Sequence, residues 1–117
     1  MKRLTTALIS VVLLLGFSSL AAAYKIADDA TGGDCTQIGV WDTATKTCTL
    51  TADIYAPGGA ISIDSDYVTL DGNGHRIYGN NTWRSNGVTL TWGRTGVTVR
   101  NLVVEKFYFG IRLEPLV

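Results

Sequence analysis

The sequence holds few of the residues that carry metal-dependent or nucleophilic chemistry. Among its 117 residues are one histidine, one methionine and two cysteines. Soft metals such as copper need several sulfur or imidazole ligands, so we assign no metal ligand. A lone histidine is usually packed or solvent-facing, and we expect this of His75. We assign no catalytic residue.

An excess of positive charge is also absent. The chain has ten basic and ten acidic residues. Removal of an N-terminal segment that contains Lys2 and Arg3 leaves eight against ten, a net charge of −2. Nucleic-acid binding needs a concentrated basic surface, so we expect no nucleic-acid partner.

The first 23 residues have the features of a secretory signal peptide. Lys2 and Arg3 precede an apolar run from Ala7 to Phe17, and a run of three small residues, Ala21 to Ala23, provides the cleavage site. This arrangement is typical of a cleaved export signal, and the run is short for a membrane span. An uncleaved anchor is the alternative. We expect a secreted or periplasmic protein with no membrane attachment after cleavage.

Residues 24–57 contain both cysteines, Cys35 and Cys48. Export favours a disulfide between them. Strand-like segments at 37–41 and 47–51 flank a polar turn at 42–46, which predicts a hairpin. We expect this N-terminal cap to cover the first turn of the repeats that follow.

Residues 58–117 contain two recurring strand motifs. The first recurs as Ile61-Ser62-Ile63, Gly87-Val88-Thr89-Leu90 and Gly110-Ile111-Arg112-Leu113; the second as Val68 to Asn73 and Val97 to Asn101. The offsets of 23 and 29 residues lie in the range of solenoid repeats. Apolar and small polar residues alternate within each motif, and Asn73 and Asn101 follow as corner residues. This indicates an all-β parallel β-helix. A hairpin-built sandwich stays open, whereas the Leu-rich pattern of a leucine-rich repeat is missing.

The run VTLDGNGHRIYG, the GV-x-L strand and TGVTVRNLVVEKFYFGIRL resemble right-handed parallel β-helix repeats of the pectin-lyase-like superfamily. They are most similar to NosD-like and carbohydrate-binding β-helix proteins. The resemblance covers residues 61–113. It implies a right-handed β-helix of two to three coils with a disulfide-bonded hairpin cap. The superfamily includes lyases, hydrolases, epimerases and non-catalytic scaffolds, so the resemblance is specific for fold rather than for activity.

The strand pattern also predicts which side chains form outward columns. One column holds Ser62, Thr89 and Arg112, and another holds Thr69 and Thr98. Glycosidic chemistry needs paired carboxylates, or a base with cationic support for a uronate lyase. The two columns offer only hydroxyl groups and one guanidinium, which is typical of an ordinary strand surface rather than of an active site.

Three aspartates are the acidic candidates. Asp64 and Asp66 lie in a turn, where Asp commonly caps its own backbone. We expect no cofactor, with calcium at these two residues as the alternative. Asp71 beside Gly72 is expected to form a corner.

Aromatic and basic residues suggest a binding surface. The candidates are Trp83, Arg84, Trp92, Arg94 and Arg112. Exposed aromatic rings beside arginines can stack on sugars and pair with carboxylates or sulfates. The alternative is that Trp92 and Tyr108 only pack against the strands.

We therefore predict an exported, non-catalytic domain that binds polysaccharide or cell-envelope glycan. One alternative is the N-terminal part of a polysaccharide lyase, epimerase or hydrolase. Another is a structural or adhesive surface module. The final strand carries no capping pattern, which predicts end-to-end self-association.

Overall fold

A computed structural model describes residues 23–114. The predicted signal peptide, apart from Ala23, lies outside the described residues. The elements in chain order are β1 (Tyr24–Ile26), α2 (Cys35–Ile38), β2 (Gly39–Asp42), β3 (Thr47–Leu50), β4 (Ile54–Tyr55), β5 (Ile61–Ile63), β6 (Thr69–Asp71), β7 (Arg76–Tyr78), β8 (Asn86–Leu90), β9 (Thr98–Arg100), β10 (Val103–Glu105) and β11 (Phe109–Leu113).

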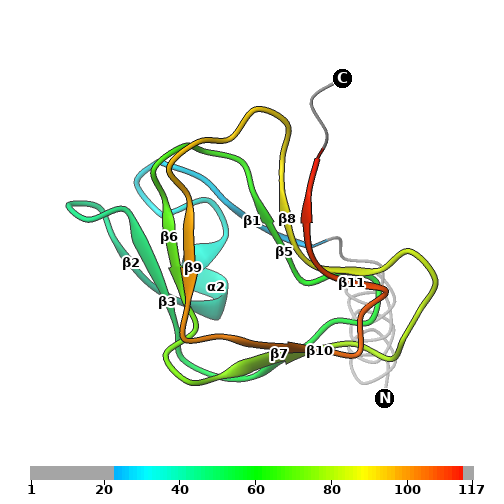
Figure 1. Ribbon diagram of the computed structural model, residues 1–117. Helices are drawn as coiled ribbons and strands as arrows, with labels where there is room; N and C mark the ends of the chain where they lie inside the picture. Colours follow the sequence, from blue (N-terminus) through cyan, green and yellow to red (C-terminus); the bar gives the residue numbers. More distant parts are fainter. Residues whose placement is uncertain (1–22, 115–117) are drawn as a thin grey trace, which may run out of the picture.

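The strands form three sheets around a shared interior (Figure 1). The strand orders are β1-β5-β8-β11, β4-β7-β10 and β2-β3-β6-β9. Neighbouring strands run parallel in every pair except β2 and β3. From β4 to β11 the chain enters the three sheets in turn, so each strand lies beside one from the preceding circuit.

The register confirms the predicted outward columns. Ser62 lies beside Thr89, and Thr89 lies beside Arg112. Thr69 likewise lies beside Thr98. Alternate residues point inward, because side chains of a strand alternate between its faces.

Inward-facing aliphatic side chains fill the space between the sheets. Those with no exposed surface include Ile26, Leu50, Ile63, Leu70 and Ile77. They come from all three sheets, so the sheets share one core, to which the exposed strand β11 does not contribute. Burial of apolar surface is the main stabilising contribution in such a small domain.

The disulfide prediction is confirmed: Cys35 and Cys48 are bonded, with their Cα atoms 5.9 Å apart. The hairpin is confirmed as the antiparallel pair β2 and β3. Through β3 the hairpin pairs with β6 and extends that sheet, so it covers the edge of the first circuit. Helix α2, which was not predicted, buries Cys35 and Ile38 and packs against β1, β2 and β3.

The predicted fold class is therefore wrong. A right-handed β-helix of two to three coils behind a separate hairpin cap is not what residues 23–114 form. They form a compact body of three mostly parallel sheets of short strands, one of which includes the hairpin, and a four-residue helix. The two recurring motifs predicted other strands, and β4, β7 and β10 were not predicted. Strands β4 and β7 share only the two residues Ile-Tyr, and β10 has no residue in common with either at these positions. The prediction also treated residues 24–57 as a separate cover, whereas β1, β3 and β4 pair with later strands.

Candidate functional site

Two connections meet at one corner of the molecule. Residues 79–85 join β7 to β8, and residues 106–108 join β10 to β11. They lie side by side because β7 pairs with β10 and β8 pairs with β11. Asn81, Arg84 and Lys106 have positive φ angles of 63°, 61° and 63°. These left-handed residues reverse the chain at the corner.

Ser85 fastens the two connections together. It is almost completely buried, and its hydroxyl donates to the carbonyl of Thr82 at 2.7 Å. The same hydroxyl accepts from the backbone N–H of Tyr108 at 3.2 Å, and the Ser85 carbonyl accepts from the N–H of Phe109 at 2.9 Å. Ser85 is not among the predicted site residues, because nothing in the sequence shows that a serine in this polar loop is buried.

An aromatic cluster lies over this corner. The rings of Trp83 and Tyr108 meet edge to face with centroids 4.8 Å apart. The rings of Tyr108 and Phe109 are 4.7 Å apart and nearly perpendicular. The guanidinium of Arg84 lies 5.6 Å from the Trp83 ring centre, and that of Arg112 lies 5.3 Å from the Phe109 ring centre.

These five residues line a surface pocket of about 320 Å³. Three of them, Trp83, Arg84 and Arg112, are predicted site residues, although they come from a loop and a distant strand. Tyr108 was considered only as packing, and Phe109 was not considered at all. The pocket combines rings that can stack with two guanidinium groups that can bind anions.

The charge distribution singles out the same corner. Residues 23–114 contain eight basic side chains, of which five form ion pairs: Lys25, Lys46, Arg76, Arg94 and Arg100. Among the described residues, Arg84, Lys106 and Arg112 have no ion-pair partner. Arg84 and Arg112 line the pocket, and Lys106 lies in the connection that carries Tyr108. Positive charge that acidic side chains do not neutralise is therefore found at this corner, although the chain as a whole has no excess of basic residues.

Comparison of the chain with known protein families, curated proteins and solved structures finds no match. The resemblance to the pectin-lyase-like superfamily therefore stays a prediction.

The other two predicted site residues lie at the opposite end of β8. Trp92 is exposed and follows that strand, whereas Trp83 precedes it. Arg94 donates from Nη1 to the carbonyl of Asp64 at 2.8 Å, and its Nε lies 3.6 Å from Oδ1 of Asp66. Arg94 thus ties two loops together and does not take part in the pocket.

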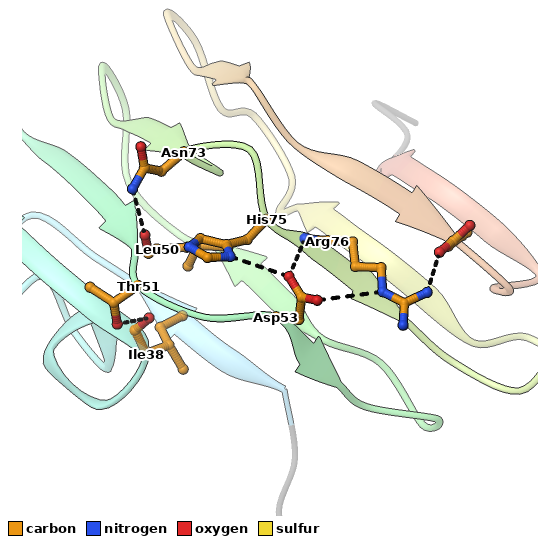
Figure 2. A network of polar contacts seen from close by, with 8 residues as sticks. Ile38, Leu50, Thr51, Asp53, Asn73, His75 and Arg76 are labelled. Carbon is orange, nitrogen blue, oxygen red and sulfur yellow. Dashed lines mark hydrogen bonds and ion pairs between the residues drawn. The ribbon is translucent and has the colours of Figure 1, made fainter.

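A second polar cluster surrounds Asp53 (Figure 2). One of its carboxylate oxygens lies 3.2 Å from Nδ1 of His75 and accepts from the backbone N–H of Arg76 at 3.0 Å. The other lies 3.6 Å from Nε of Arg76, whose Nη1 donates to Glu105 at 2.8 Å. The backbone hydrogen bond from Arg76 is the main reason that the pKa of Asp53 is lowered. The group joins the loop before β4 to β7 and β10.

The acidic candidates have partners in the structure. Asp64 accepts from the Ser62 hydroxyl at 3.0 Å, and Asp66 accepts from the backbone N–H of Thr95 at 3.0 Å. Asp71 accepts from the N–H of Asn73 at 2.8 Å, as expected of a corner residue. Over residues 23–114 no three His, Cys, Asp or Glu side chains gather to hold a metal. Calcium binding at Asp64 and Asp66 stays an untested alternative.

The described part of the chain has no helix long and apolar enough to cross a membrane. The Cys35–Cys48 disulfide is compatible with an extracellular or periplasmic location.

Proposed function

We propose that this protein is an exported, non-catalytic domain that binds acidic polysaccharide or acidic cell-envelope glycan. The ligand would bind in the corner pocket formed by Trp83, Arg84, Tyr108, Phe109 and Arg112. The observation that carries the proposal is the coincidence of two unpaired arginines with exposed aromatic rings in one hollow. An acidic sugar can bind both kinds of group. The apolar face of its ring can stack on the aromatic side chains, and its carboxylate or sulfate accepts hydrogen bonds from guanidinium.

The support for a binding role is the placement of the charges. Arg84 and Arg112 are held beside the Trp83 and Phe109 rings, so their positions are already restricted before a ligand arrives. Restricting the groups in advance reduces the entropy lost on binding. Ser85 restricts the two connections in the same way. The lack of a carboxylate among the pocket residues favours binding over acid–base catalysis of glycoside cleavage.

The test compares two exposed tryptophans. The Trp83→Ala variant is expected to bind polygalacturonate or a sulfated glycan at least about tenfold more weakly, a loss of about 1.4 kcal/mol. Trp92→Ala is the matched control: Trp92 is 58% exposed against 67% for Trp83, but it lies at the far end of β8. Affinity is measured by isothermal titration calorimetry or by retardation in glycan-containing gels.

The charge requirement is tested with Arg84→Gln and Arg112→Gln. Both should weaken binding to the acidic glycan and reduce its salt dependence, and a neutral glucan should bind poorly to the parent. Equal losses for Trp83→Ala and Trp92→Ala, or no binding of any acidic glycan by the parent, would reject the proposal.

A further inference from the structure

The connection between β7 and β8 contains a short motif, Asn80-Asn81-Thr82. An asparagine followed by any residue except proline, and then by serine or threonine, is the acceptor motif for N-linked glycans in exported proteins. The chain has five asparagines, and Asn80 is the only one with a hydroxyl residue two positions later. Because so short a motif also arises by chance, its position in the fold has to decide whether it can carry a glycan.

All three residues of the motif are exposed. Their backbone is nevertheless held to the body of the molecule. The N–H of Asn81 donates to the carbonyl of Lys106 at 2.8 Å, and the carbonyl of Thr82 accepts from the N–H of Ser85 at 3.1 Å. A glycan is bulky and hydrophilic, so at this exposed position it would extend into solvent while the backbone hydrogen bonds of the connection stay in place.

The two side chains that define the motif are in direct contact. The hydroxyl of Thr82 donates to Oδ1 of Asn80. Among residues 23–114 the Asn80 side chain makes no other hydrogen bond, so its Nδ2 has no partner there that a reaction would have to displace. A transferase that recognises the hydroxyl and modifies the amide therefore finds both groups together on an exposed part of the chain.

Other asparagines have structural roles that Asn80 lacks. Nδ2 of Asn73 donates to a backbone carbonyl of β3 at 3.4 Å, and Nδ2 of Asn101 donates to Oδ1 of Asp71 at 3.2 Å. Oδ1 of Asn86 is buried. The side chain of Asn80 bonds only within its own motif, so the contacts of the fold do not account for an asparagine at this position.

We propose that Asn80 is the site of an N-linked glycan that is added as the chain is exported. The donor is an oligosaccharide attached to a polyprenyl phosphate or pyrophosphate. Nδ2 of Asn80 attacks C1 of the first sugar, so a C–N bond forms and the bond from C1 to the phosphate oxygen breaks. The lipid phosphate leaves with the electron pair, and one amide proton passes to a base of the transferase.

This inference rests on the export that is part of the proposed function, and it does not depend on glycan binding in the corner pocket. Asn80 is not one of the residues that line the pocket. Trp83, the first pocket residue of this connection, follows three positions later. Modification of Asn80 therefore leaves the pocket side chains chemically unchanged.

Translation of the full chain in the presence of endoplasmic-reticulum membranes tests the proposal. Export into the membrane vesicles is measured by resistance of the chain to added protease. Glycosylation is measured by a single shift to lower mobility in gel electrophoresis, which peptide-N-glycosidase should reverse. We expect the protected chain to show this shift. The glycosidase converts a glycosylated asparagine into aspartate, so mass spectrometry should then find aspartate in place of Asn80.

Variants of the motif show which groups are needed. Asn80→Gln and Thr82→Ala should abolish the mobility shift, whereas Thr82→Ser should keep it because the hydroxyl remains. Asn81→Gly is the matched control. It removes an asparagine from the same connection, suits the φ angle of 63° at this position, and leaves the motif intact.

Each negative result has a distinct meaning. A chain that stays sensitive to protease is not exported, which would overturn this proposal together with the exported location. A protected chain without the mobility shift would overturn the glycosylation site alone and leave the proposed glycan binding standing. A shift that survives Thr82→Ala, or that is lost in Asn81→Gly, would show that this motif does not specify the modification.

Discussion

At the scale of single residues, carboxylates join adjacent circuits of the chain by accepting hydrogen bonds from corner residues. Asp71 accepts from the backbone N–H of Asn73, from the side-chain amide of Asn101 at 3.2 Å and from Nε of Arg100 at 3.2 Å. Asn73 and Asn101 have positive φ angles of 54° and 53°. Asparagine tolerates this left-handed conformation better than most residues, which explains its use at both corners.

These hydrogen bonds make stability depend on pH. They lower the pKa of Asp71 below 3.8, chiefly through the N–H of Asn73. A lowered folded-state pKa stabilises the fold above the unfolded-state value and ceases to do so as the pH falls through the folded value. We expect Asp71→Asn to be less stable than the parent at pH 6, with the difference shrinking below about pH 3.8. Urea unfolding from pH 2 to 7 measures it.

The control for this experiment is Asp28→Asn. It removes the same charge, but the Asp28 carboxylate pairs only with Lys46 and accepts no backbone hydrogen bond among the described residues. A stability difference between parent and Asp71→Asn that stays constant across the whole pH range would contradict the assignment.

At the scale of the elements, each strand is too short to be stable alone and depends on burial of its inward side chains. Strand β6 has three residues, of which Leu70 is fully buried and Thr69 faces outward. It lies between β3 and β9, so its inward position is covered from both sides.

The loss of stability on shortening a side chain of β6 should therefore depend on whether that side chain faces the core or the solvent. Leu70→Ala should lower the free energy of unfolding by about 3 kcal/mol, because it removes buried methyl groups and leaves a cavity. Thr69→Ala, one residue away, should cost less than about 1 kcal/mol. Similar urea midpoints for the two variants would show that the register of β6 is wrong.

At the scale of the whole molecule, the disulfide connects the N-terminal elements to the sheets. Cys35 lies in α2 and Cys48 in β3, and both are fully buried. Strand β3 in turn pairs with β6. The bond therefore holds the only helix of the described chain against a sheet built mainly from later strands.

Reduction of this disulfide should destabilise the whole domain. Opening a loop with a sequence separation of 13 residues should cost roughly 3 kcal/mol. Urea unfolding with and without dithiothreitol measures the difference. A Cys35→Ala/Cys48→Ala double variant is the control, because dithiothreitol should not change its stability.

The sequence by itself determined the strand motifs, the disulfide and part of the site. Alternating β-branched residues predicted β5, β6, β8, β9 and β11 and their outward columns, since alternation follows directly from the geometry of a strand. The spacing of the cysteines in a chain with a predicted export signal indicated their pairing. Aromatic and basic residues in polar loops suggested Trp83, Arg84 and Arg112, because large side chains in loops are seldom needed for packing.

Only the tertiary structure decided how these pieces combine. The strands β4, β7 and β10 share at most an Ile-Tyr pair, too little for a repeat, and form because neighbouring circuits supply their hydrogen bonds. The hairpin became part of a sheet because β3 offers an edge to β6. Trp83 lies beside Tyr108 and Phe109 rather than Trp92 because pairing of β8 with β11 brings their beginnings together, whereas the two ends of β8 stay apart. Arg112 reaches this corner through its side chain, whose guanidinium lies near the Phe109 ring. Such contacts arise from pairing between distant segments, and no local pattern of residues specifies them.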